Sequence, residues 1–169
     1  MIILGIDPGS RRTGYGVIEA RGNRFGLIDA GTVEAPRGAE LPRRLRVIHE
    51  ALVSIAADAA PDVAAVEDVF NARNARSSLI LGQARGAALL AAALRDIHVA
   101  EYAPREVKMA LTGNGAATKE QVRFMVQRLL GLAKPPASTD TSDALAIALC
   151  HAMRSGSPVA SAKGRNRAT

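Results

Sequence analysis

Ile2-Ile3-Leu4-Gly5-Ile6-Asp7-Pro8-Gly9 is the stretch of sequence that decides the fold. Its aliphatic residues predict a short buried strand, and the Asp-Pro-Gly that ends it is a turn signal. Asp7 therefore stands at the carboxyl end of a strand, where open α/β sheets place their ligands. An aspartate here also suits a purely local role in capping the turn, so this position alone leaves both interpretations open.

The residues that follow predict a meander of strands and then alternating helices and strands. Thr13–Ala20 and Arg24–Val33 are partly β-branched and are separated by a short Arg-Gly-Asn turn, which predicts an antiparallel meander with the first strand. Apolar residues three and four positions apart predict a helix over Leu41–Ala59. The other predicted elements are strands over Val63–Val69 and Ile97–Ala103 and helices over Ser77–Asp96, Pro104–Leu111, Thr118–Leu130 and Ser138–Met153. The order β-β-β-α-β-α-β-α predicts an α/β fold with a mixed five-stranded sheet and helices on both faces.

Length and composition are those of one globular domain. The 169 residues are 48% hydrophobic and 22% charged, without an internal repeat. We expect one domain over residues 1–153 and a basic, disordered tail over residues 154–169, which holds four of the 22 Lys and Arg residues and none of the 16 acids. The tail is either a solubilising end or an arm that touches phosphates. The formal net charge of +6 permits nucleic-acid binding without demonstrating it.

Several protein classes are not expected from this sequence. No apolar run approaches the roughly 18 residues of a membrane span, so we expect no membrane partner. The first residues carry no basic segment before the apolar run, which favours a strand over a signal peptide. Cys150 is the single cysteine, and no Cys or His spacing is typical of a zinc site. A cytoplasmic location is therefore expected.

Four carboxylates stand in positions that suggest chemistry. Glu67 lies in the most strand-like segment of its region, and a buried carboxylate is costly unless it is paired or binds a metal. Asp68 should point to the opposite face as an exposed acid. Asp140 and Asp143 share one face of the first turn of the last predicted helix. Taken separately, that pair could simply stabilise the helix dipole.

The same four acids, if they meet, are suited to metal ions. Oxygen ligands without cysteine or paired histidine select Mg²⁺, with Mn²⁺ as a substitute. A cluster that holds two such ions per site serves the attack of water on a phosphodiester. If Asp7, Glu67, Asp140 and Asp143 do meet, they are candidate metal ligands of such a site, and the local roles of each acid stay open alternatives.

Five short motifs together resemble one family. They are Ile6-Asp7-Pro8-Gly9-Ser10, Thr13-Gly14-Tyr15-Gly16, Glu67-Asp68-Val69-Phe70, Leu81-Gly82-Gln83-Ala84-Arg85-Gly86 and Asp140-Thr141-Ser142-Asp143-Ala144-Leu145-Ala146. Each is weak alone, but in this order and spacing the set resembles the RuvC family of bacterial crossover junction endodeoxyribonucleases, the Holliday junction resolvases. The resemblance extends from residue 2 to about residue 153.

The resemblance implies an RNase H-like fold and a homodimer with four acidic catalytic positions, which fall on the four acids already named. It implies a structure-selective endonuclease that resolves four-way DNA junctions by paired symmetric nicks, leaves 5′-phosphate ends, and serves homologous recombination and DNA repair. The RuvA-RuvB branch-migration complex would be a partner. We expect the dimer interface to be helical, with the Ala-rich face of Ser77–Asp96 as one candidate surface.

The resemblance also implies positions that contact DNA. Lys108 and Lys119 match lysines that face the DNA, although each could equally be an ordinary surface lysine. Phe70 matches an aromatic residue linked to the opening of base pairs, and a core position is its alternative. Arg73 and Arg76 lie in a polar segment, residues 71–78, that we expect to be a loop near the cleaved strands.

Two other functions are weighed against the resolvase. One is a short RNase H-like nuclease of ribosomal RNA maturation, whose first strand also carries Gly-x-Asp. The Gly-Gln-Ala-Arg-Gly helix and the Asp-x-x-Asp-Ala-Leu-Ala ending favour the resolvase over it. The other is a catalytically inert nucleic-acid-binding module, which the presence of all four acids disfavours. A phosphate-binding P-loop is excluded because Tyr15, and not lysine, follows the second glycine.

Overall fold

A mixed five-stranded sheet forms the centre of the computed structural model, which describes residues 1–68 and 74–155. The strands are β1 (Ile2–Asp7), β2 (Arg12–Arg21), β3 (Arg24–Glu34), β4 (Val63–Glu67) and β5 (His98–Tyr102). The helices of the described residues are α1 (Leu41–Ala59), α2 (Ala75–Ala93), α3 (Pro104–Thr112), α4 (Lys119–Leu129) and α5 (Thr139–Ser155).

The topology confirms the predicted meander with crossovers. The strand order across the sheet is β3-β2-β1-β4-β5. Strand β1 pairs antiparallel with β2, and β2 pairs antiparallel with β3. Strands β4 and β5 then add in parallel on the other side of β1. The carboxyl ends of β1 and β4 consequently lie side by side at one edge of the sheet, which is where open α/β sheets place their sites.

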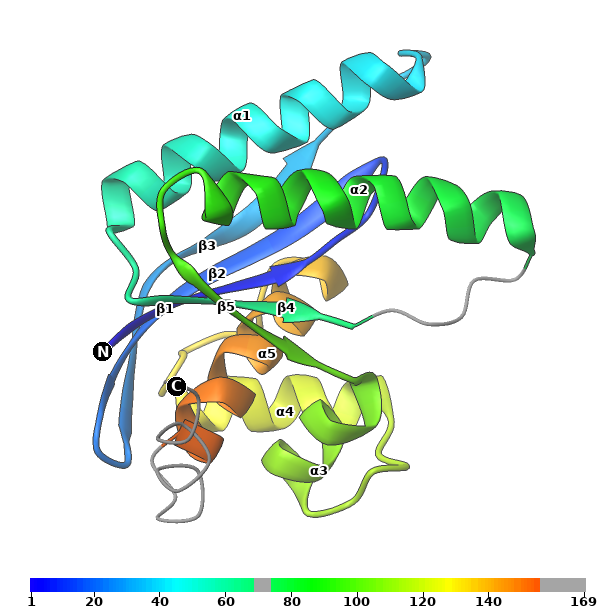
Figure 1. The fold of residues 1–169 in the computed structure, drawn as a ribbon. Helices are drawn as coiled ribbons and strands as arrows, with labels where there is room; N and C mark the ends of the chain where they lie inside the picture. The colour runs from blue at the N-terminus through cyan, green and yellow to red at the C-terminus, as the bar shows by residue number, and fades with distance from the viewer. Residues whose placement is uncertain (69–73, 156–169) are drawn as a thin grey trace, which may run out of the picture.

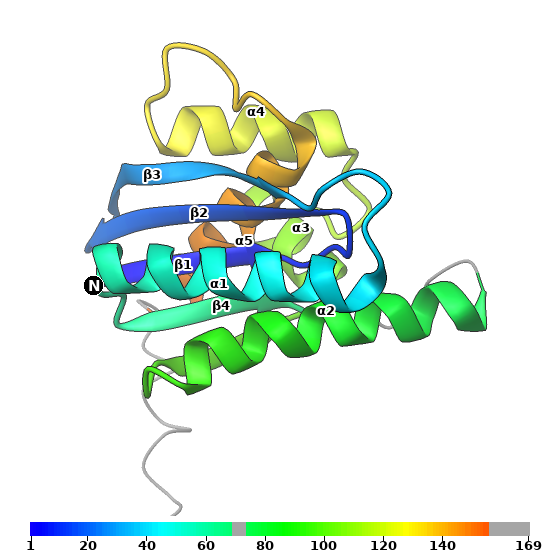
Figure 2. The ribbon, with the colours of Figure 1, turned by 90° about the horizontal axis from the view of Figure 1, so that it is seen from above.

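Helices cover both faces of the sheet, as predicted (Figure 1). Helices α1 and α2 lie on one face, and α3, α4 and α5 lie on the other, an arrangement that the view from above also shows (Figure 2). Strand alternation separates the two cores: Leu4 and Ile6 face α1 and α2, whereas Ile3 faces α5. Asp7 and Glu67 follow the second pattern and therefore project on the α5 side.

Helix α5 lies directly on the sheet because the strands beneath it carry glycines. A Cβ atom added at Gly5 would overlap the carbonyl oxygen of Ala144, and one at Gly14 would overlap that of Asp140. At Gly16 an added Cβ would meet the side chain of Leu145. Most residues of α5 from Thr141 to Ala152 are buried as a result. These three glycines set how closely the start of α5 can approach the end of β1.

Most elements differ by a few residues from the predicted bounds, and three of these differences bear on the site or the chain end. Strand β4 ends at Glu67, so this acid is a strand-end residue and not an interior one. Helix α2 begins at Ala75 because the side chain of Asn74 accepts a hydrogen bond from the backbone N–H of Ser77 and caps it. Helix α5 continues to Ser155, and Arg154 pairs with Glu106 across to α3 at 2.9 Å.

Over residues 1–68 and 74–155, none of the helices has the length and apolar character that a membrane crossing requires.

Candidate active site

Asp7 and Glu67 are brought together by the register of two parallel strands. Ile6 of β1 stands opposite Val66 of β4, so the next residue of each strand is one of the two acids. Both side chains project on the α5 face, and hydrogen bonding from Asp7 lowers the pKa of Glu67 against the rise that burial causes. The turn after Asp7 is closed by Thr13, whose Oγ1 donates to the carbonyl oxygen of Gly9 at 2.9 Å.

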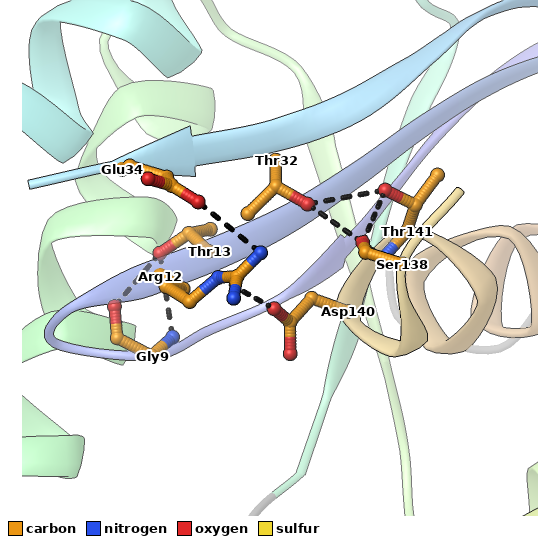
Figure 3. A network of polar contacts seen from close by, with 8 residues as sticks. All are labelled: Gly9, Arg12, Thr13, Thr32, Glu34, Ser138, Asp140 and Thr141. Atoms are coloured by element: carbon orange, nitrogen blue, oxygen red, sulfur yellow. Dashed lines mark hydrogen bonds and ion pairs between the residues drawn. The ribbon is translucent and has the colours of Figure 1, made fainter. Parts of the chain in front are cut away.

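The start of α5 is fixed by a small hydroxyl network that joins it to β3 (Figure 3). Ser138 Oγ accepts a hydrogen bond from the backbone N–H of Thr141 at 3.0 Å, which caps the helix. Thr32 Oγ1 lies 2.9 Å from Ser138 Oγ and 3.1 Å from Thr141 Oγ1. Asp140 and Asp143 therefore begin from a helix end that is held in place on two sides, by the network and by Gly14 beneath it.

Electrostatics show that the four acids share one environment. Burial, together with the charges of Glu67, Asp143 and Asp140, raises the pKa of Asp7 from its ordinary value to about 8, against a lowering by Lys119. The pKa of Glu67 is also raised, first by burial and then by Asp143. Carboxylates that perturb one another in this way are typical of sites that bind cations or perform catalysis.

Two cations partly balance this charge. Lys119, the first residue of α4, donates from Nζ to Asp143 Oδ2 at 2.7 Å, and this hydrogen bond raises the pKa of the lysine. Arg12 bridges two acids: its Nε lies 3.1 Å from Asp140 Oδ2, and its Nη2 lies 3.1 Å from Glu34 Oε1 (Figure 3). Asp143 and Asp140 are thus engaged by protein cations in this conformation.

The donor set suits a hard cation, although the groups are not arranged around one point. In the described part of the chain, no three Asp, Glu, His or Cys side chains surround a single position closely enough to hold a metal ion. All four side chains are nevertheless carboxylates, whose oxygens are the donors that hard divalent cations prefer. A bound divalent cation would also remove the repulsion that raises the pKa of Asp7. The residues present therefore fit such an ion, with Asp140 and Asp143 exchanging their present partners for it.

A cleft of about 270 Å³ opens beside the acids, where the end of β4 meets α3, α4 and α5. Its lining includes Glu67 and Asp143 on one side and Lys108 and Lys119, from α3 and α4, on the other. The structure thus brings both predicted lysines to the acids. We call this opening the lysine cleft.

Arg85 is a residue of this region for which the sequence analysis predicts no role. It lies in α2, within the Gly-Gln-Ala-Arg-Gly motif, and its Nε donates to the backbone carbonyl of Glu67 at 3.2 Å. Its guanidinium also pairs with Asp68, at 3.6 Å, and with Glu101. Asp68 is therefore an ion-paired acid beside the site and not a free surface carboxylate. The motif marked Arg85 as a feature of the family, but only the fold shows what it contacts.

The remaining predicted residues divide into two groups. Phe70 and Arg73 lie outside the described residues. Arg76 is exposed and lies in the first turn of α2. The expectation of a loop up to residue 78 is therefore wrong for residues 75–78, because Asn74 caps the helix and α2 begins at Ala75. Among the groups expected to be structural, Cys150 is buried and His151 Nδ1 lies 2.8 Å from the hydroxyl of Tyr102, away from the four acids.

The sequence of this chain matches one family of known proteins. The family model described as crossover junction endodeoxyribonuclease RuvC matches residues 3–151. A protein of that name from Bordetella petrii is 53% identical over 152 residues, covering 90% of this chain and 83% of the relative. Another from Granulibacter bethesdensis is 50% identical over 166 residues, covering 96% of this chain and 90% of the relative.

Comparisons of structure agree. The RuvC structure from Thermus thermophilus is similar with a TM-score of 0.85 and 35% identity, and covers 92% of this chain and 95% of its own. RuvC from the same organism in complex with a Holliday junction substrate gives a TM-score of 0.88 and 36% identity, with the same coverage. The yeast mitochondrial Holliday junction resolvase Ydc2, at 12% identity and a TM-score of 0.63, shares the fold. Neither the ribosomal RNA nuclease nor the inert module is favoured by these likenesses.

Proposed function

Because this chain belongs to the RuvC family of crossover junction endodeoxyribonucleases, metal-dependent nucleases that resolve Holliday junctions, we propose that Asp7, Glu67, Asp140 and Asp143 are its catalytic residues. The observation that carries the proposal is that two helix-start acids lie close enough to two strand-end acids to help raise the pKa values of Asp7 and Glu67. Structural ion pairs alone do not account for it, because Asp7 faces three other acids and only one nearby lysine.

The metal proposed for this site is Mg²⁺, two ions per site, with Mn²⁺ as a substitute. The four carboxylates would hold the ions. When bound, such ions activate water and stabilise the oxygen that leaves the phosphorus, which gives 5′-phosphate ends. The role of the chain is to keep four acidic oxygen donors close together in a partly buried place before any ion or substrate arrives.

The neighbouring cations act on the substrate and on the acids. Lys119 stays protonated through its hydrogen bond to Asp143, and with Lys108 it places positive charge in the lysine cleft, where a strand phosphate can lie. Arg85 fixes the backbone at Glu67, so this acid keeps its direction as the strand ends. Arg12 holds Asp140 toward the site.

Paired nicks in two symmetry-related strands require two such sites, which a twofold dimer supplies. The Ala-rich face of α2 is not available for this, because Ala84, Ala88, Ala91 and Ala92 are buried within the chain. The opposite face exposes three leucines, Leu79 at 65%, Leu90 at 51% and Leu94 at 66%. Gly82 and Gly86 lie between them with open space around their α-carbons. We propose this leucine and glycine face of α2 as the dimer contact.

The RuvA-RuvB branch-migration complex is proposed as a partner on family membership, and the cytoplasm as the location, because recombining chromosomal DNA is found there. Stimulation of junction cleavage by purified RuvA and RuvB tests the partnership. The dimer contact is tested by Leu90→Lys, which should give a monomer in light scattering, whereas Leu27→Lys, an exposed leucine on β3, should leave the dimer intact. A dimeric Leu90→Lys protein would contradict this interface.

The function is tested by incubating the protein with a synthetic immobile four-way junction and with linear duplex, with and without Mg²⁺. We expect symmetric nicks in the junction only, only with Mg²⁺, and ends that ligase can seal. Asp7→Asn and Glu67→Gln should abolish nicking while leaving junction binding intact. Asp58 is an exposed carboxylate of α1, so the control variant Asp58→Asn should retain nicking. Equal cleavage of duplex or RNA would move the ribosomal RNA nuclease ahead of the resolvase.

A further inference from the structure

A second cleft lies on the other side of the four acids, and arginine dominates it. It has a volume of about 500 Å³, within the range of small-ligand sites. Its walls are the turn that opens β2, the end of β3, the connection over residues 35–39 and the first part of α1. The charged residues that line it are Arg11, Arg12, Glu34, Arg37 and Arg44. Four guanidinium groups thus face one carboxylate.

The charge of this arginine cleft is not neutralised by the protein. Glu34 is committed to Arg12, which also binds Asp140. Within residues 1–68 and 74–155, no carboxylate lies at ion-pair distance from Arg11, Arg37 or Arg44. Elsewhere on the domain bases and acids nearly balance, so this concentration is local. Positive charge left open inside a cleft favours an anionic ligand.

Arg44 gives a second, independent indication of a ligand. Its Nη1 donates a long hydrogen bond of 3.4 Å to Ser10 Oγ, while its Nε is buried and has no hydrogen-bond partner. A buried N–H without an acceptor is costly and rare in native proteins. Two walls of the cleft are joined by a hydrogen bond, because the backbone N–H of Ala35 donates to the carbonyl oxygen of Arg11 at 2.9 Å. This bond connects the segment over residues 35–39 to the turn that opens β2.

The position of the arginine cleft relative to the acids identifies the class of ligand. Arg12 pairs with Asp140 (Figure 3) and also lines the cleft, so the cleft adjoins the carboxylate cluster directly. The lysine cleft adjoins the same cluster through Glu67 and Asp143. An anionic polymer that crosses the acids would meet cations before and after them. The planar guanidinium is suited to phosphate oxygens, which it can bind in pairs.

We propose that the arginine cleft is a binding site for the sugar–phosphate backbone of the cleaved DNA strand, one or more phosphates away from the bond that is hydrolysed. The proposal rests on the proposed function and extends it, because it adds a subsite to the four acids and the lysine cleft. Contacts of this kind fix the register of a strand without reading its sequence. The cleft therefore positions the strand, and the acids perform the chemistry.

The test compares Arg37→Gln and Arg44→Gln with Arg46→Gln in binding to a four-way junction. Arg46 is an exposed residue of α1 that pairs with Glu50 outside the cleft. The substitution Arg46→Gln therefore removes the same charge as the cleft variants without changing the cleft. Arg37 lies in an exposed connection, which protects the test if Arg44→Gln fails to fold. Each cleft variant should bind about three- to tenfold more weakly and lose about one unit from the slope of log affinity against log salt.

The strand itself is identified by replacing single phosphates near the cleavage position with neutral methylphosphonates. We expect at least one replacement that weakens binding by the wild type and by Arg46→Gln but has no effect on Arg44→Gln or on Arg37→Gln. Inorganic phosphate, compared with chloride at equal ionic strength, should not displace the junction preferentially. Preferential displacement that is lost in Arg44→Gln, with unchanged junction affinity, would assign the cleft to a free anion and overturn the proposal.

The proposal is also overturned if the cleft variants and Arg46→Gln bind the junction with equal affinity and equal salt slope, and if the same methylphosphonate replacements weaken their binding. An acidic protein segment would then be the candidate occupant of the cleft. This outcome is distinct from failure of the proposed function. If the proposed function fails, the wild type and Arg46→Gln themselves show no preference for the junction over duplex.

Discussion

Replacing Asp7 with asparagine should stabilise the metal-free protein, and the effect should depend on pH in a defined direction. Burial and three neighbouring acids raise the pKa of Asp7 from 3.8 to about 8 in the folded protein. Between about pH 4 and pH 8 the folded protein therefore keeps a proton that the unfolded chain has released. The free energy of unfolding of the wild type must fall as the pH rises through this window. Asp7→Asn lacks this proton and should show a smaller fall, which comes from the raised pKa of Glu67.

The magnitude follows from the size of the change in pKa. A displacement from 3.8 to about 8 corresponds to at most about 6 kcal/mol, and relaxation of Lys119 toward the charged acid reduces it. We expect the two proteins to be equally stable below about pH 4 and the variant to be more stable by about 2–5 kcal/mol above about pH 8. Urea unfolding in EDTA across this pH range measures the difference.

Two controls make the measurement specific. Asp58→Asn, an exposed carboxylate of α1, should give a pH curve parallel to that of the wild type. Mg²⁺ in excess should raise the stability of the wild type at high pH, because an ion that binds only the folded state stabilises it, and should do so less for Asp7→Asn. The reasoning is refuted if the curves of the wild type and Asp7→Asn run parallel from acid to alkaline pH in EDTA.

The remaining predictions concern single features of the fold. Gly14→Ala should destabilise the protein by about 2–4 kcal/mol and lower nicking at least about tenfold, since its Cβ overlaps the backbone of Asp140, whereas Gly26→Ala, which meets open space, should do neither in unfolding and cleavage assays. Lys119→Ala should weaken junction binding and reduce its salt slope by about one unit, and an unchanged slope would make Lys119 a structural partner of Asp143 only. Burial raises the pKa of the Cys150 thiol to about 12, so a disulfide reagent should react with it only after unfolding; rapid labelling of the native protein would show that α5 opens.

The order of strands and helices was predictable because each element carries its own periodicity. The apolar run that ends in Asp7 and the Ala-Ala-Val-Glu run that ends in Glu67 both indicate buried strands. Two parallel strands bring their carboxyl ends together, so the proximity of these two acids follows from local pattern and topology alone. The boundary errors have local causes, of which the cap formed by Asn74 is the clearest.

The contacts between distant segments were not predictable in the same way. Arg12 pairs with Asp140, but nothing near Arg12 in the sequence distinguishes it from an ordinary surface arginine. Arg85 lies in a family motif, but the motif does not indicate that its guanidinium donates to the carbonyl of Glu67. The arginine cleft has the same origin, since Arg37 and Arg44 join Arg11 only when the connection before α1 folds back on the turn that opens β2. Such sites depend on packing geometry, which hydrophobic periodicity does not encode.

Helix α5 explains why this site is both costly and well defined. Its buried residues pack on the sheet through three glycines, and this close contact brings Asp140 and Asp143 next to Asp7. The hydrophobic burial of the rest of the helix opposes the repulsion among the acids, because moving α5 away to separate the charges would expose the core along its length. Lys119 and Arg12 reduce that repulsion further without filling the space between the acids. The site therefore stores unfavourable charge that a cation can neutralise, which is why the same substitution, Asp7→Asn, is expected to stabilise the fold and abolish the activity.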